Sequence, residues 1–178
     1  MNSLIRTALK VVICDISGTS VMTLFSWMTS KKKPGFQEPA HLGKMAHRLL
    51  PLISKDKSRL VGWAAHYGMG GLFTILYIYL WENRKLKCDL STTLLLGLVS
   101  GVAGAGIWKA TFKYHPLPGK TNYNLFYLQR IPAHIVFAIF GSLTYHIINK
   151  HENNMASQKV LPVEVDYQAS ESRRITLP

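Results

Sequence analysis

The sequence predicts an all-α, polytopic membrane protein: four transmembrane helices in a bundle, with an interfacial amphipathic helix between the first two spans. Three observations carry this prediction. The chain of 178 residues is 48% hydrophobic but only 17% charged, whereas soluble domains average about 25% charged residues. Its apolar residues gather in four blocks, each close to the roughly 20 residues that cross a hydrocarbon core. Each block is apolar around most of its circumference, unlike a soluble helix with one apolar face.

The four predicted spans cover about residues 8–28, 61–81, 91–112 and 131–148. Lys, Arg, Trp or Tyr side chains flank each span, as anchoring at a membrane–water interface requires. The first block is not typical of a removable signal peptide, because Asp15 interrupts it and no A-x-A cleavage site follows. It ends in the basic run Lys31-Lys32-Lys33, a stop-transfer pattern. We therefore expect the first block to remain in the protein as a helix.

The connections between the blocks differ in kind. Residues 82–90 predict a tight hairpin, with Asp89 or Ser91 as the cap of the third span. The longer 29–60 connection contains a predicted interfacial helix at about residues 39–54. A helix packed on a partner protein is the alternative. Apolar residues follow helical spacing on one face, and basic residues and histidines occupy the other: Leu42, Met45, Ala46, Leu49, Leu50 and Ile53 against His41, Lys44, His47 and Arg48.

The spans and their connections form one predicted domain over residues 1–149. The 113–130 connection combines a Pro-rich turn with an aromatic stretch that also suits the membrane interface. Residues 150–178 are polar, contain Pro162 and lack a helical period. That composition predicts a mostly disordered tail.

The distribution of charge predicts how the spans are oriented. Four spans place both termini on one side and the connections 29–60 and 113–130 on the other. Lys and Arg number 11 in these two connections, against 9 at the termini and in the 82–90 hairpin. By the positive-inside rule, the two long connections then face the cytoplasm. The margin is small, and bundles with an even number of spans more often keep both termini inside, so the opposite orientation stays open.

Ionisable residues inside the spans mark a candidate site, because they are costly in a bilayer. His66 lies near the start of the second predicted span and His134 near the start of the fourth, so both lie toward the long connections. Each follows an alanine, and each precedes a tyrosine by eleven residues, at Tyr77 and Tyr145. This pattern suggests a repeated helical hairpin. A repeat would place the two histidines at similar depth on facing helices.

Two facing histidines permit several chemistries. They could be the axial ligands of a haem or bind a metal ion, although zinc requires two further ligands. They could belong to a proton or small-solute path. They could also simply donate hydrogen bonds that tighten the bundle. Lys109 and His115 lie toward the same face and complete the candidate ligand-binding set, although Lys109 more simply extends to the interface.

Asp15 enters the membrane from the opposite side, and we expect it to lie too far away to join the histidines. It is either neutral, paired with a Ser or Thr of another helix, or part of a proton relay. Small residues predict where the helices approach one another closely. They recur every four residues at Gly97, Gly101 and Ala105 in the third span, and around His66 at Gly62 and Gly70 in the second. His66 is therefore expected on a packed face.

The predicted function is non-enzymatic. The chain shows no phosphate-binding loop, nucleophile elbow, HExxH or CxxC motif. Its net charge is +12, and the basic residues lie beside the spans. That placement fits anionic lipid headgroups better than nucleic acid. We expect a small membrane subunit or helper protein, partnered by another membrane protein or by copies of itself. A haem- or metal-binding redox component using His66 and His134 and a proton or small-solute pathway are the alternatives.

Several short motifs resemble the YagU-like family of small bacterial inner-membrane proteins. These motifs are Gly-Thr-Ser-Val-Met-Thr-Leu at residues 18–24, Ala65-His66, His115-Pro116-Leu117-Pro118 and Pro-Ala-His-Ile-Val-Phe at residues 132–137. The resemblance would cover about residues 8–148. It implies a four-helix protein in the bacterial inner membrane. It implies no reaction, because the function of that family is uncharacterised.

Overall fold

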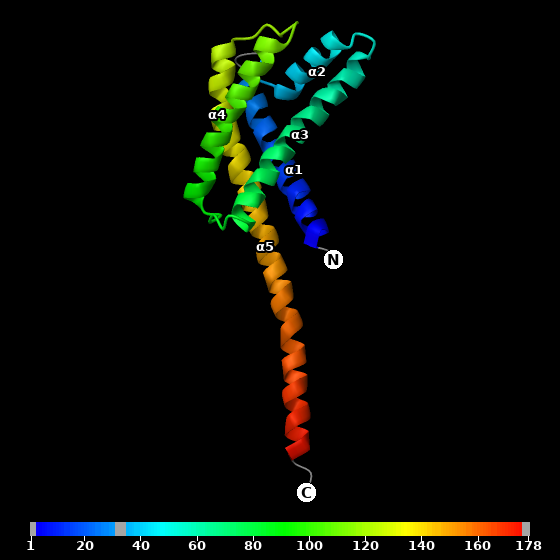
Figure 1. Cartoon of the computed structure of the whole chain (residues 1–178), viewed down its shortest axis with the longest axis vertical. Helices are drawn as coiled ribbons and strands as arrows, with labels where there is room; N and C mark the ends of the chain where they lie inside the picture. The colour runs from blue at the N-terminus through cyan, green and yellow to red at the C-terminus, as the bar shows by residue number, and fades with distance from the viewer. Residues whose placement is uncertain (1–2, 31–34, 176–178) are drawn as a thin grey trace. The chain divides into compact units, whose positions relative to one another are not determined.

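The computed structural model describes residues 3–30 and 35–175, and every regular element among them is a helix (Figure 1). The chain divides into two compact units, Met1–Thr144 and Tyr145–Pro178. The presence of helices alone among the regular elements of the described residues confirms the predicted all-α class. The elements are α1 (Ser3–Ser30), α2 (Glu38–Leu49), α3 (Lys55–Glu82), α4 (Leu90–Tyr114) and α5 (Tyr123–Ile175).

The first unit is an up-and-down arrangement of long helices. The helices α1, α3, α4 and the first part of α5 alternate in direction, and the short α2 lies at the end where α1 stops and α3 begins (Figure 1). Short connections favour antiparallel neighbours of this kind. Asp89 caps α4, because its carboxylate accepts a hydrogen bond from the Thr92 backbone amide at 2.8 Å. Of the two predicted capping residues, the structure therefore uses Asp89.

Three helices in the described part of the chain are long and apolar enough to cross a membrane: Leu4–Ser30, Leu90–Tyr114 and Tyr123–Met155. They contain the predicted spans 8–28, 91–112 and 131–148, so the chain is a multi-pass membrane protein. The predicted span 61–81 lies inside α3, which is as long as α1 at 28 residues. The glycines, His66 and tyrosines of α3 dilute its hydropathy, and it is not among the three.

Apolar side chains face outward in the first unit and polar side chains face inward. Large exposed hydrophobic residues occur on all four long helices, among them Ile16, Leu72, Leu95 and Leu143. A soluble domain rarely exposes so continuous an apolar surface, whereas a lipid bilayer solvates it. Buried polar residues line the interior instead. They include Asp15, Thr19, Ser26, Glu38, His66, Ser100, Gln129, Arg130 and His134.

Glycines allow the helix backbones of the first unit to approach closely. A Cβ atom on Gly97 would lie 2.8 Å from Ile135 Cα, and one on Gly101 would lie 2.7 Å from Ile131 Cα, so α4 packs directly on α5. Gly62 likewise abuts Pro39 of α2, and Gly70 abuts Asp15 and Thr19 of α1. The predicted small-residue stripes are confirmed as packing faces.

The helix α2 forms near its predicted position but differs in two respects. It ends at Leu49 rather than near residue 54, because Pro51 follows and the Ser54 side chain caps α3 instead. His41, predicted on the outer polar face, is buried, with ring centroids 5.2 Å from Phe126 and 5.8 Å from Phe112. Aromatic residues of α4 and α5 cover that side of α2, which no periodicity within α2 could reveal.

The C-terminal region also differs from its prediction. Residues 150–178 were expected to be mostly disordered, but helix α5 continues to Ile175. The first part of this region contains Lys, Glu, Gln, Ala and Met, which favour helix even without an apolar face. Composition alone therefore predicted its polarity but not its backbone.

Candidate functional site

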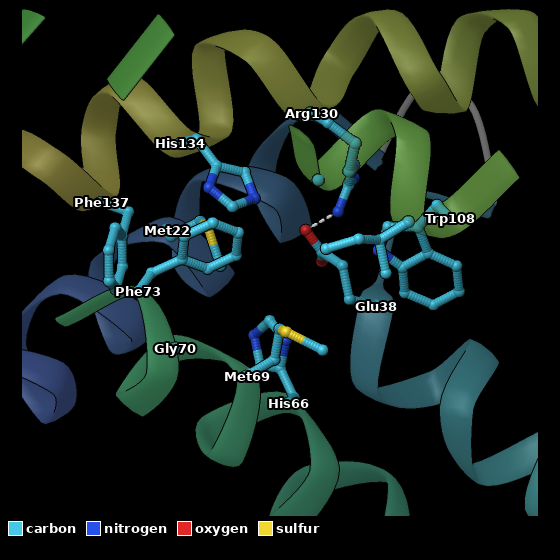
Figure 2. A pocket seen from close by; sticks show the side chains of 12 residues that line it. Met22, Glu38, His66, Met69, Gly70, Phe73, Trp108, Arg130, His134 and Phe137 are labelled. Atoms are coloured by element: carbon cyan, nitrogen blue, oxygen red, sulfur yellow. Dashed lines mark ion pairs between the residues drawn. The ribbon is translucent and has the colours of Figure 1, made fainter. Parts of the chain in front are cut away.

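The first unit contains a small cavity of about 40 Å³ whose wall receives residues from all five helices (Figure 2). His66 of α3 and His134 of α5 both line it, on opposite sides. The two histidines that the sequence singled out therefore contribute to one site. The other lining residues are Met22, Glu38, Met69, Gly70, Phe73, Gly104, Ile107, Trp108, Arg130 and Phe137.

A buried ion pair forms one end of the cavity wall. The Glu38 carboxylate of α2 pairs with the Arg130 guanidinium of α5, and the exposed fractions of their side chains are only 3% and 1%. Arg130 also donates hydrogen bonds to the Phe36 carbonyl at 3.0 Å and to the Phe126 carbonyl at 3.3 Å. Its guanidinium lies 4.3 Å from the Phe126 ring centroid. Such multiple donation is what a buried arginine needs to offset its lost hydration.

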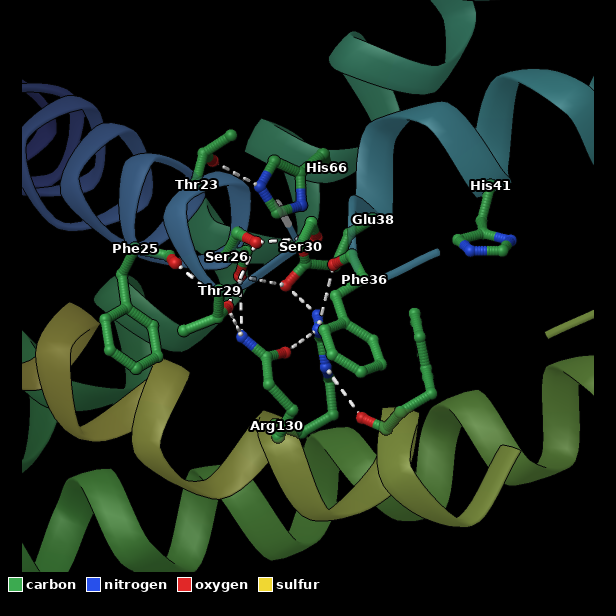
Figure 3. Close-up of polar contacts among 12 residues, drawn as sticks. Thr23, Phe25, Ser26, Thr29, Ser30, Phe36, Glu38, His41, His66 and Arg130 are labelled. Atoms are coloured by element: carbon green, nitrogen blue, oxygen red, sulfur yellow. Dashed lines mark hydrogen bonds and ion pairs between the residues drawn. The ribbon is translucent and has the colours of Figure 1, made fainter. Parts of the chain in front are cut away.

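Residues of α1 and α5 complete a polar network around this pair (Figure 3). Ser26 donates to Glu38 Oε1 at 3.1 Å, and Gln129 donates to Ser26 at 3.3 Å and to Thr29 at 3.1 Å. Gln129 also accepts a hydrogen bond from Arg130. We call Ser26, Thr29, Glu38, Gln129 and Arg130 the polar core. It ties α1, α2 and α5 together where hydrophobic burial supplies little force between helices in lipid.

A hydrogen bond fixes the orientation and tautomer of His66. The Thr23 hydroxyl donates to the Thr19 carbonyl at 2.6 Å and lies 2.8 Å from His66 Nε2. Because the Thr23 proton is already committed, His66 Nε2–H donates to Thr23 and Nδ1 carries the free lone pair. Thr19 in turn donates to Asp15 Oδ1 at 2.7 Å. A polar chain thus runs from Asp15 to the cavity wall.

His134 is buried differently, with one ring nitrogen left without a partner. Its exposed fraction is 8%, and its ring packs edge-on against Phe73 at a centroid distance of 5.1 Å. His134 Nε2 faces Gly104, where a Cβ atom would lie only 2.6 Å away. His134 Nδ1 and Glu38 Oε2 have no hydrogen-bond partner, and both atoms are buried. Orphaned buried polar atoms in one site indicate a small polar occupant such as water.

The size of the cavity limits what that occupant can be. A volume of about 40 Å³ exceeds the roughly 10–15 Å³ that one water needs but falls far below the roughly 300 Å³ of small-molecule pockets. The residues present do not fit a haem, because the cavity is too small and Thr23 occupies His66 Nε2. No group of three or more metal-binding side chains occurs among the described residues.

The remaining predicted site residues lie outside the cavity. Lys109 is exposed on α4. His115 caps the end of α4, and its Nδ1 accepts a hydrogen bond from the Leu117 amide at 3.1 Å. Asp15 is buried against Gly70, and its hydroxyl partner Thr19 belongs to its own helix rather than to another. Asp15 does not line the cavity with the two histidines; its only connection to them among the described residues runs through Thr19 and Thr23.

Glu38 and Arg130 were not predicted as site residues, because both lie in the connections between the predicted spans. Two local signals could have identified them. Arg130 immediately precedes the fourth apolar block, and Glu38 is an isolated acid in a basic segment directly before Pro39. Neither signal reveals that the two side chains pair.

Comparisons of the chain with protein-family models, with curated proteins and with solved structures found no match.

Proposed function

We propose that this chain is a four-span protein of the bacterial inner membrane with a non-enzymatic role, as a small membrane subunit or helper protein. The proposal is supported above all by α3. Its outward side chains are apolar, with exposed fractions of 70% at Leu60 and 62% at Leu72, while His66, Thr74 and Tyr77 face the interior. A helix with that distribution, antiparallel to two candidate spans, is suited to lipid rather than water. The YagU-like motifs support the bacterial inner membrane.

The geometry of the cavity supports the non-enzymatic role. Its wall is formed by residues on the inward faces of the helices. Its volume admits water-sized species but not an organic substrate. The polar core connects three helices through an ion pair and several hydrogen bonds. We infer that its main task is to hold the helices in one arrangement, so that the apolar outer surface can bind a partner in the membrane. That partner is another membrane protein or a second copy of the chain.

A proton pathway is the second candidate function, and one observation favours it. Glu38 and His134 both line the cavity, and Glu38 Oε2 and His134 Nδ1 are buried without hydrogen-bond partners, so two titratable groups that could take part in proton transfer lie at one site. One observation opposes it. The chain from Asp15 to His66 passes through the Thr19 carbonyl, which cannot relay a proton.

A flux measurement separates the two candidates. The full chain is reconstituted into vesicles that contain a pH-sensitive dye, and a pH gradient is imposed. If the chain is a membrane subunit or helper protein that conducts no protons, the gradient decays as in protein-free vesicles. A faster decay that is lost in both Glu38→Gln and His134→Ala would favour the proton pathway. The same purified sample tests the haem alternative, which requires a Soret band that disappears in His66→Ala and in His134→Ala.

A further inference from the structure

A second hollow, outside the bundle interior, lies between α2 and α3. This groove has a volume of about 490 Å³ and carries basic residues from both helices: Lys44 and His47 from α2, and Lys55 and Arg59 from α3. Pro39 and Trp63 supply apolar wall. None of the described residues that line the groove is acidic. The nearby Asp56 is exposed and lies 3.7 Å from Arg59, which it neutralises only weakly in solvent.

The order of these residues along α3 matches the depth profile of a phospholipid. Lys55, Arg59 and Trp63 are spaced four residues apart and so lie on one side of the helix, covering about 12 Å from Lys55 to Trp63. The basic side chains lie at the helix start, toward the long connections. Trp63 lies one turn further into the apolar segment, at the depth where tryptophans anchor at membrane interfaces.

Contacts with neighbouring residues keep the groove and its tryptophan in place. Gly43 and Gly62 bring α2 and α3 together: a Cβ atom on Gly43 would lie 2.9 Å from the Ser58 carbonyl oxygen. The Trp63 indole stacks on Tyr67 with a centroid distance of 6.1 Å and an interplanar angle of 27°. Tyr67 OH in turn hydrogen-bonds Ser20 of α1 at 2.8 Å. These contacts fix the orientation of the indole, which presents an apolar surface beside the basic side chains.

We propose that this groove binds an anionic phospholipid, with its headgroup phosphate between Lys44, Lys55 and Arg59 and the upper part of an acyl chain against Trp63. The inference rests on the proposed membrane location and adds a specific lipid site to it. A free phosphate would use only the basic end of the groove. A lipid uses both the basic end and the apolar end, which is why we favour it.

The test uses the full chain in detergent micelles, with brominated phosphatidylglycerol as a quencher of tryptophan fluorescence. We expect saturable quenching that is stronger than with brominated phosphatidylcholine and that is lost in Trp63→Phe. In the double variant Lys55→Gln/Arg59→Gln the lipid should bind about fivefold more weakly for each charge removed. The matched control is Lys113→Gln/Lys120→Gln, which removes two charges near the same end of the bundle but outside the groove and should leave binding unchanged.

Three results would overturn the proposal. The first is equal quenching by both lipids, and the second is an equal loss of binding in the control variant. The third is full competition by inorganic phosphate, which would identify a soluble anion as the ligand. Alkaline extraction of membranes that contain each variant keeps this test separate from the membrane location. A chain that stays in the membrane but lacks lipid selectivity contradicts the lipid site alone.

Discussion

At the scale of single residues, Arg130 has the most demanding environment in the first unit. It is almost fully buried, pairs with Glu38 and donates to backbone carbonyls of Phe36 and Phe126. Removing one partner of such a pair leaves an uncompensated buried charge, which is far more destabilising than removing both. The polar core therefore loses most stability when only one member of its ion pair is removed.

We predict that Arg130→Met lowers the free energy of unfolding by about 3–5 kcal/mol, because Glu38 then stays buried without its cation. The double variant Glu38→Gln/Arg130→Met should be more stable than the single variant, since no charge is left unpaired. Thermal unfolding in detergent measures both. The matched control is Arg59→Gln: its pair with Asp56 is exposed, so it should change stability by at most about 1 kcal/mol. Equal losses in Arg130→Met and Arg59→Gln would refute a buried pair.

His41 gives the protein a predicted response to acid. Its ring is buried among Trp108, Phe112 and Phe126, with Nε2 2.5 Å from the Gly35 carbonyl oxygen. Burial lowers the pKa of His41 below its ordinary value of 6.5, and the charges of Lys44 and Arg48 lower it further, although the Gly35 carbonyl acts in the opposite direction. Below pH 6.5 the unfolded chain therefore binds more protons at this position than the folded chain does.

Stability should accordingly be constant with respect to His41 above about pH 6.5 and should fall as the pH drops below that value. His41→Phe removes the titrating group while keeping an aromatic ring in the site, so it should lose this part of the acid sensitivity. Unfolding midpoints measured between neutral pH and mildly acidic pH test the prediction. The same acid-dependent loss in His41→Phe as in the wild type would assign the effect to other groups.

At the scale of elements, the contact between α4 and α5 depends on glycine. A methyl group on Gly101 would lie 2.7 Å from Ile131 Cα and 3.2 Å from its carbonyl oxygen. These are backbone atoms of a helix, which cannot rotate away as a side chain can. Gly106 is on the same helix, yet a methyl group there would meet nothing within 4 Å.

This difference predicts opposite effects of the same substitution. Gly101→Ala should destabilise the protein by about 1–3 kcal/mol, because α4 must move away from α5. Gly106→Ala should be neutral or stabilise it by up to about 1 kcal/mol, because alanine is the better helix former. Melting temperatures of the two variants in one detergent provide the comparison. A Gly101→Ala protein that melts no lower than Gly106→Ala would contradict the close helix contact.

The predictability of each element from sequence depended on whether its determinants were local. Long apolar blocks located α1, α4 and the first part of α5, and the Asp89 cap was visible in a short hairpin. His66 and His134 could be paired from depth and spacing. Glu38 and Arg130 could not be paired in this way. They lie 92 positions apart in the sequence and meet only because α2 folds back against α1 and α5. The burial of His41 has the same non-local origin.

At the scale of the whole molecule, the buried ion pair also changes how the charge distribution is interpreted. Arg130, which pairs with Glu38, was counted among the basic residues that favour a cytoplasmic location for the long connections. Since the two side chains neutralise each other inside the unit, neither acts at the membrane surface. Without Arg130, ten Lys and Arg side chains remain on that face, against nine on the other. The positive-inside rule therefore still places the long connections in the cytoplasm, but by one basic residue instead of two.

The proposed four-span arrangement predicts which connections share a side of the membrane. If α3 crosses, the connection before it and the 82–90 hairpin after it lie on opposite sides. In a background with Cys14→Ser and Cys88→Ser, we expect Lys57→Cys and Lys120→Cys to react with a membrane-impermeant maleimide only after the cells are permeabilised, because both belong to the long connections. Lys85→Cys should react in intact cells.

Each alternative topology gives its own labelling pattern. Labelling of Lys57→Cys and Lys85→Cys from the same side would show that α3 does not cross, and would leave the three helices that hydropathy identifies as the only spans of the described chain. The reverse pattern, with Lys85→Cys protected in intact cells and the other two exposed, would retain four spans but invert them. Inversion would place the basic groove between α2 and α3 at the outer leaflet, so the lipid it binds would have to be drawn from that leaflet.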